Sequence, residues 1–292
     1  LRSDSRFSLG PRNQWAELKG LKRDELQCVY RYFDAQTDDL LLTQAVARSA
    51  ESLGAVIQEH CTFERASRYK NNMIAVSLGS TDHRQQKHHT QAHCRVLINA
   101  AGPWVSHIQS NIDFVDTGPS ISLVQGSHIE LSQPISKGIF YVESPIDGRP
   151  VFIMPWPSGT LVGTTEKAHN TAPEHCRPSE EEVLYLQQTL LHYFPDYSGT
   201  LTNSWAGLRV LPSEASNSKS VKQTLRPFSH QARDTIIHVD DESAPSTITL
   251  YGGKLTAYRT TAEQVAQIAS RHLQACGVKP SKPPIETASI PL

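Results

Sequence analysis

The chain has 292 residues, of which 38% are hydrophobic, and carries a formal net charge of −1 at pH 7. This length allows one large domain or two ordinary ones, and the composition excludes disorder throughout the chain. A charge so close to zero provides neither the basic field that binds nucleic acid nor a polybasic patch for membrane lipids.

The first hundred residues predict one helix and a small sheet. Residues 1–34 are irregular, and apolar residues at helical spacing then predict a helix over 38–53 that ends at Gly54. A strand is expected at 55–59. Three further strands are expected to form a meander: 62–69, 73–78 and 94–100.

The polar stretch 79–93 lies within this region and carries four histidines: His83, His88, His89 and His93. Two imidazoles at positions i and i+4 of a helix can share a metal ion. The stretch contains almost no apolar residue that would fix such a geometry, so we expect a solvated loop and no metal site.

The middle of the chain predicts an antiparallel sheet and one helix. Ser179 and Glu182 form a capping box at the start of a helix over 179–195, and apolar residues at helical spacing give it one buried face. Strands are expected at 121–124, 127–131, 140–143, 151–154 and 160–164.

The C-terminal part returns to alternating strands and helices. After a polar stretch over 213–223, strands are expected at 233–239 and 247–251, and a helix over 260–276 follows a Gly-Gly turn. Together with the run of strands in the middle, this order predicts a mixed α/β (α+β) fold.

Two groups of residues have the chemistry of a cofactor and anion site. Gly252 and Gly253 allow the backbone to approach a flat ligand closely, and Lys254 projects from the same turn. Arg209 and Arg233 lie next to apolar segments that can hold them rigidly, and the guanidinium fork binds phosphate oxygens in pairs. The alternatives are a tight turn with a solvated lysine and two arginines in ordinary surface ion pairs.

Five motifs follow one another along the chain. They are Val96–Trp104, Gly126–Ile129, Pro155-Trp156 with Leu161–Thr165, Trp205–Arg209 and Tyr251–Arg259. From about Tyr32 to the C-terminus, the chain resembles the FAD-dependent glycerol-3-phosphate dehydrogenases, within the D-amino-acid-oxidase-like group of flavoproteins.

The resemblance implies roles for four polar residues. Arg209 and Arg233 would bind the substrate phosphate, and Lys254 would lie over the substrate and the flavin, where a cation favours negative charge as hydride arrives. His128 would lie near the substrate as the candidate base for its C2 hydroxyl proton. A lone histidine in a strand is otherwise often a core residue.

The resemblance also implies that FAD contacts two segments of small residues. Such segments are compatible with ordinary packing too. The candidate cofactor-binding residues are Ala100, Ala101, Gly102, Gly252, Gly253, Lys254, Leu255 and Thr256.

Proteins of this family open with a strand, a Gly-x-Gly-x-x-Gly turn and a helix that carries the FAD pyrophosphate, yet no two glycines of this chain are two residues apart. We therefore expect a fragment: a truncated FAD-binding parallel sheet with an inserted antiparallel substrate-binding sheet. FAD is expected of the intact enzyme and absent from this chain, which alone would be inactive. The expected regions are an irregular segment that contributes to the substrate region (1–34), the FAD-binding remnant (35–110 and 233–277), the substrate-binding domain (111–232) and a tail (278–292).

The intact enzyme would oxidise sn-glycerol 3-phosphate to dihydroxyacetone phosphate by hydride transfer to FAD and pass the electrons to quinone or another acceptor. The alternatives are another flavin-dependent oxidase of the same fold, acting on an amine or hydroxy acid, and a non-catalytic ligand-binding module that has lost FAD. Five scattered cysteines without a Cys-x-x-Cys spacing favour a cytoplasmic location. Contact with the inner face of the cytoplasmic membrane would be peripheral, because no apolar run reaches the roughly 18 residues of a membrane span.

Overall fold

The computed structural model describes residues 8–9, 15, 18–24, 26–81, 87–115, 118–135, 138–212, 234–279 and 286–290. The chain forms two compact units, each made from two separate stretches. The first unit contains 1–36 and 123–209, and the second contains 37–122 and 210–292. Each unit has its own sheets and its own apolar core, and the predicted mixed α/β class is confirmed.

The first unit is built on an antiparallel sheet in the order β11-β7-β10-β9-β8, with β12 also paired to β7. The two strands predicted at 121–124 and 127–131 are one continuous strand, because β11 pairs with its first half and β10 with its second half. The strands are β7 (Ile121–Leu131), β8 (Phe140–Glu143), β9 (Pro150–Trp156), β10 (Gly159–Gly163), β11 (Lys167–His169) and β12 (Leu201–Pro212).

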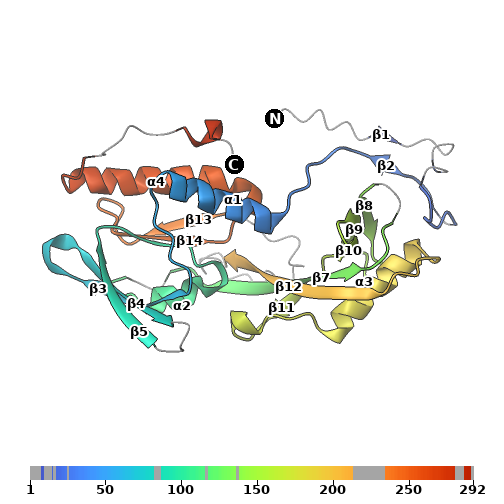
Figure 1. Ribbon diagram of the computed structural model, residues 1–292, viewed down its shortest axis with the longest axis horizontal. Coiled ribbons are helices and arrows are strands. Elements are labelled where there is room, and N and C mark those ends of the chain that lie inside the picture. The colour runs from blue at the N-terminus through green and yellow to red at the C-terminus, as the bar shows by residue number, and fades with distance from the viewer. Residues whose placement is uncertain are drawn as a thin grey trace, which may run out of the picture. The chain divides into compact units, whose positions relative to one another are not determined.

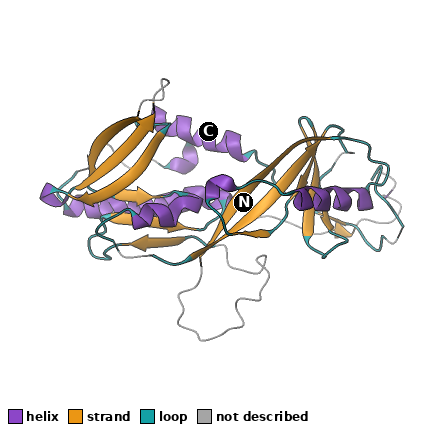
Figure 2. Cartoon of the chain, turned by 90° about the horizontal axis from the view of Figure 1, so that it is seen from below, coloured by secondary structure: helices purple, strands orange, loops and turns teal. Residues whose placement is uncertain are grey.

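Helix α3 (Glu180–Tyr193) packs on this sheet, as Figure 2 shows. The predicted capping box is confirmed: the Ser179 side chain accepts from the backbone N–H of Glu182, and the Glu182 side chain accepts from the backbone N–H of Ser179. Leu186, Leu190 and Phe194 pack against buried residues of β7, β9 and β10. Residues 1–34, expected to be irregular, contain two short paired strands, β1 (Ser8–Leu9) and β2 (Tyr30–Arg31).

The second unit contains a three-stranded sheet in the order β13-β14-β6. Strand β14 (Thr247–Tyr251) pairs antiparallel with β13 (Ile236–Val239) and parallel with β6 (Leu97–Asn99). Helix α4 (Tyr258–Ala275) buries Val265 and Ala269 against Ile248 of β14. Helix α1 (Asp39–Ser52) lies on the same side of this sheet as α4 (Figure 1).

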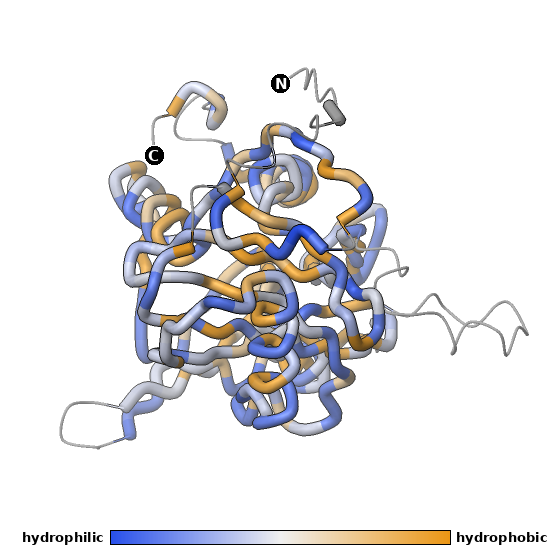
Figure 3. Tube along the Cα trace, turned by 90° about the vertical axis from the view of Figure 1, so that its right-hand side faces the viewer, coloured by the Kyte–Doolittle hydropathy of each residue, from blue (hydrophilic) through white to orange (hydrophobic). Residues whose placement is uncertain are grey.

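A second three-stranded sheet completes this unit: β3 (Cys61–Arg68), β4 (Ile74–Thr81) and β5 (Lys87–Cys94), which pair antiparallel in that order. Its core is formed by Ala66, Ile74 and Val76, together with Ile112, which follows helix α2 (Val105–Ser110). Figure 3 shows the apolar stretches in orange and the polar ones in blue.

Three local predictions in this unit are wrong. The expected loop 79–93 belongs largely to β4 and β5, because its polar residues pair with β4 through the backbone. The third strand of the meander is therefore β5, whereas 97–99 joins the other sheet. Residues 55–59, within the described range 26–81, form no strand, and Val56 is 84% exposed.

Short 3-10 helices and turns connect these elements. They are Lys70–Asn72, Gly102–Trp104, Pro173–His175, Leu255–Ala257 and Thr287–Ser289. Among the helices in the described part of the chain, none combines the length and apolar character that a bilayer crossing requires.

Candidate functional site

His128 lies on β7, between the backbone of β10 and an aromatic side chain of β12. It is paired in register with Gly163 of β10, where any side chain would collide with the imidazole ring. On β12, the indole ring of Trp205 stacks on the imidazole, with ring centroids 5.9 Å apart and an interplanar angle of 14°. The sheet therefore holds the histidine ring in a fixed plane.

Arg209 reaches the same face of β7 from β12. Gly126 is two residues from His128, so the two share one face of the strand. A Cβ added at Gly126 would lie 3.2 Å from Nη2 of Arg209 and 2.5 Å from Oγ1 of Thr164. The guanidinium thus rests on the backbone of β7, and the structure brings together two of the predicted site residues, Arg209 and His128.

A carboxylate contacts this guanidinium. Nη1 of Arg209 donates to Oε1 of Glu166 at 3.5 Å, and the side chain of Glu166 is only 9% exposed. Nη1 of Arg149 donates to the backbone carbonyl of Glu166 at 2.7 Å and lies 4.0 Å from its Oε2. Nε of Arg149 also pairs with Asp147 at 3.3 Å, so the two arginines and the two carboxylates carry no net charge, and the guanidinium of Arg209 is the cation at this face of β7.

The opposite face of β7 is held by a buried carboxylate. Glu182 accepts from Oγ of Ser127 at 2.8 Å, Oγ1 of Thr165 at 2.6 Å and Nε2 of Gln125 at 2.8 Å. Burial alone would raise the pKa of Glu182, but the hydrogen bonds from Thr165, Ser179 and Ser127 outweigh it and hold the pKa below its usual value. This network fixes the strand that carries Gly126 and His128.

The predicted cofactor segments lie in the second unit, at one edge of its sheet. Ala100, Ala101 and Gly102 follow β6, and the segment from Gly252 to Thr256 follows β14. Because β6 and β14 are parallel neighbours, both segments start at the carboxyl ends of adjacent strands. Ligands of open α/β sheets bind outside the carboxyl ends of the strands.

The backbone at this edge is open to a ligand. Asn99 is buried, donates through Nδ2 to the carbonyl of Val105 at 3.0 Å and accepts from the amide of Ala101, which fixes the turn after β6. A Cβ at Gly102 would meet no atom within 4 Å. Gly252 and Gly253 have φ values of +71° and +102°, as the predicted glycine turn requires.

These features fit a flavin dinucleotide. The open backbone after β6 and the glycine turn after β14 provide two adjacent peptide surfaces, and Lys254 and Leu255 lie exposed beside the second of them. Peptide N–H groups and an exposed lysine can donate hydrogen bonds to the oxygens of phosphate and flavin.

The predicted residues thus form two groups, one in each unit. Arg233 lies outside the described residues, and so does His83. That Lys254 and Arg209 contact the same substrate stays a prediction. His88, His89 and His93 lie on strand β5, and among the described residues there is no cluster of three or more side chains that could hold a metal ion.

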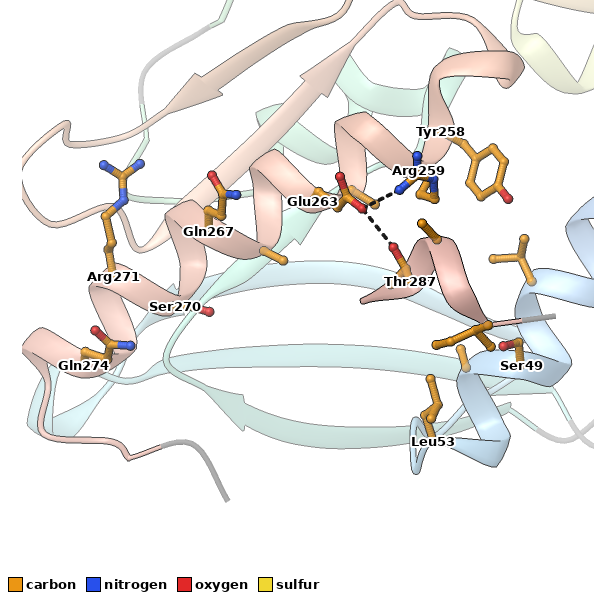
Figure 4. Close-up of a pocket in the computed structure, with 16 residues that line it drawn as sticks. Ser49, Leu53, Tyr258, Arg259, Glu263, Gln267, Ser270, Arg271, Gln274 and Thr287 are labelled. Carbon is orange, nitrogen blue, oxygen red and sulfur yellow. Dashed lines mark hydrogen bonds and ion pairs between the residues drawn. The ribbon is translucent and has the colours of Figure 1, made fainter. Parts of the chain in front are cut away.

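A groove of about 1280 Å³ lies between α1 and α4 in the second unit (Figure 4). Val46, Ala50 and Leu53 line one side of it, and Ala262 and Ala266 line the other. At its edge, Glu263 accepts from Arg259 and from Thr287, each within 2.9 Å. Among the described residues that line it there is no predicted site residue.

Sequence reasoning missed the residues that hold the site in place. Thr164 lies in the motif Leu161–Thr165 but was assigned no role, and Glu166 follows that motif without a signal of its own. Glu182 was predicted to cap a helix, but its contacts with β7 were not predicted. The capping box was the available signal, since a carboxylate in that motif accepts several hydrogen bonds.

The comparisons with known proteins identify the family and the fold. A family model described as FAD dependent oxidoreductase (DAO) matches residues 3–259. An aerobic glycerol-3-phosphate dehydrogenase from Bacillus subtilis (strain 168) is 28% identical in an alignment of 296 residues that covers 100% of this chain and 50% of that protein. The chain thus spans about half the length of the curated relatives that it matches.

Two solved structures share the fold. One is a glycerol-3-phosphate dehydrogenase from Bacillus halodurans complexed with FAD, with a TM-score of 0.71, 24% identity and coverage of 94% of this chain and 50% of that chain. The other is a glycine oxidase from Geobacillus kaustophilus, with a TM-score of 0.65, 15% identity and coverage of 95% and 65%. Since the family model covers most of its length, the chain belongs to the family of FAD dependent oxidoreductases.

Proposed function

We propose that the whole protein oxidises sn-glycerol 3-phosphate to dihydroxyacetone phosphate with FAD as the hydride acceptor. The observation that carries this proposal is the pair formed by Arg209 and His128, a phosphate-binding cation and a base, on one face of β7. The relatives named as glycerol-3-phosphate dehydrogenases support the choice of substrate.

Each predicted residue has a distinct task in this proposal. Arg209 and Arg233 bind the phosphate, and His128 takes the proton of the C2 hydroxyl through a ring that Trp205 holds in plane. Lys254 binds the substrate and favours negative charge on the cofactor. The residues that would hold FAD are Ala100, Ala101, Gly102, Gly252, Gly253, Leu255 and Thr256. When bound, FAD supplies the hydride acceptor.

We further propose that 35–110 and 233–277 belong to the FAD-binding part and 111–232 to the substrate-binding part. Residues 1–34 would contribute to the substrate region, and 278–292 would form a tail. Transfer of the electrons to quinone or another acceptor, a cytoplasmic location and peripheral contact with the inner face of the membrane stay predictions of the sequence.

An anaerobic titration tests the reaction. Addition of sn-glycerol 3-phosphate to the FAD-loaded protein should bleach the flavin absorbance and give one equivalent of dihydroxyacetone phosphate. Glycerol at the same concentration should leave the flavin oxidised, because it lacks the phosphate that Arg209 recognises. Bleaching by an amine or a hydroxy acid, but not by glycerol 3-phosphate, would identify the alternative oxidase. A whole protein that binds glycerol 3-phosphate but takes up no FAD would identify the non-catalytic module.

A further inference from the structure

A row of alternating charges runs along the first unit and ends at Arg209. Asp147 pairs with Nε of Arg149 at 3.3 Å, Arg149 contacts Glu166, and Glu166 accepts from Arg209 at 3.5 Å. The exposed fraction of the side chain falls to 9% at Glu166, whereas it is 40% for Arg149 and 29% for Arg209. Glu166 is therefore the most shielded of these charges.

The backbone of Glu166 is fixed by the sheet. Its carbonyl accepts from Nη1 of Arg149 at 2.7 Å. The preceding residue, Thr165, is buried, donates its amide to the carbonyl of Ser127 at 3.2 Å and donates its hydroxyl to Glu182. Glu166 thus presents its carboxylate to Arg209 from a backbone that is bound to β7.

A carboxylate fixed in this way changes how an arginine binds its ligand. A long arginine side chain loses rotamer entropy when it contacts a phosphate, and this loss weakens binding. A guanidinium that Glu166 and the Gly126 backbone already hold has lost part of that freedom before the ligand arrives. Arg149 lies beside Glu166 and partly offsets its negative charge, although Arg149 also pairs with Asp147.

We propose that Glu166 is a positioning residue that preorganises Arg209 for the phosphate group of a phosphate ester. This inference rests on the proposed function of Arg209. It predicts that the charge of Glu166 strengthens phosphate binding, although that charge is itself negative. A carboxylate that merely repels the ligand would have the opposite effect.

Calorimetric titration with sn-glycerol 3-phosphate tests the direction of the effect. Glu166→Gln keeps the shape and an acceptor oxygen but removes the charge, and it should raise Kd on the order of tenfold. Glu181→Gln is the matched control, because Glu181 is 88% exposed and pairs with Lys167 at 3.4 Å. Its Kd should equal that of the wild type. Equal or tighter binding by Glu166→Gln would overturn the inference.

A second readout reports on Arg209 itself. The Nε–Hε resonance of Arg209, assigned by its loss in Arg209→Lys, should be sharp and distinct in the wild type and should move to the averaged position of exposed arginines in Glu166→Gln. An averaged signal already in the wild type would overturn the inference. If Glu166→Gln fails to fold, Arg149→Met takes its place, because it removes the hydrogen bond to the Glu166 carbonyl. The Arg209 resonance should then shift in the same direction. An unshifted resonance would overturn the inference.

The two measurements separate this inference from the function on which it rests. A wild-type protein that does not bind glycerol 3-phosphate contradicts the proposed substrate, but the resonance of Arg209 still decides whether Glu166 orders it.

Discussion

Gly126 of β7 and Arg209 of β12 approach so closely that a methyl group at Gly126 would crowd the guanidinium. A methyl group at Gly126 would lie 3.2 Å from Nη2 and 3.4 Å from Cζ of Arg209. The guanidinium therefore lies against a strand whose other face is held by Glu182. The position of this arginine is set by the sheet.

Gly126→Ala should consequently displace Arg209 and Thr164. We expect a loss of stability of about 1–3 kcal/mol from overpacking, together with weaker binding of glycerol 3-phosphate, measured by urea unfolding and by calorimetry. Gly207→Ala on β12 is the control, because its Cβ would meet no atom within 4 Å. If both variants bind the ligand as the wild type does, the guanidinium does not depend on this contact.

Glu182 should make the stability of the protein depend on pH. Its pKa is lowered in the folded state, so its contribution is fully present above the unfolded pKa, near 4.5, and is lost as the pH falls through the folded value. In urea unfolding, the wild type should therefore lose stability as the pH falls below about 4.5. The same change of pH should cost Glu182→Gln less stability.

At neutral pH, Glu182→Gln should lower the free energy of unfolding by about 2–4 kcal/mol, because the new amide group would face the donors of Gln125 and Ser179. The exposed neighbour Glu181 provides the comparison, and Glu181→Gln should change stability by less than about 0.5 kcal/mol. Similar losses in the two variants would show that the network around Glu182 contributes little.

The elements that sequence predicted well are those with local signals. The capping box at Ser179 and the apolar spacing after it define α3 within the chain itself, and Gly252 and Gly253 permit the positive φ values that their turn adopts. These features depend on residues a few positions apart, so a pattern in the sequence can show them.

The elements that sequence missed depend on distant partners. The polar residues of β5 form a strand because β4 offers a free edge to pair with, which their own composition does not reveal. The opposite error occurred at Ala55–Glu59, where an apolar pattern forms no strand. In the site, Arg209 and His128 could be predicted from motifs, but Glu166 reaches Arg209 only through the pairing of β10, β7 and β12.

The glycine turn after β14 should be needed for FAD. Gly253→Ala places a methyl group at a φ of +102° and 2.6 Å from Oγ1 of Thr235, so the turn must shift. In the intact enzyme we expect weaker FAD binding, measured by quenching of flavin fluorescence.

Gly277→Ala is the control for backbone strain, because Gly277 also has positive φ (+76°) but lies after α4, where a Cβ meets no atom within 4 Å. Gly277→Ala should lose about 1 kcal/mol of stability from positive φ alone, and Gly253→Ala should lose more because of the contact with Thr235. Equal FAD affinity in the two would place the cofactor elsewhere.

The most direct test of phosphate recognition is a comparison of glycerol 3-phosphate binding by the wild type, Arg209→Met and Arg177→Met in one calorimetric series. Arg177 is the matched control, since its guanidinium donates to the backbone carbonyls of Glu174 and Cys176. We predict that Arg209→Met loses about 1.5–3 kcal/mol of binding free energy, roughly 10- to 100-fold in Kd, and that Arg177→Met binds like the wild type. Unchanged binding by Arg209→Met would contradict the assignment of Arg209 as the phosphate ligand.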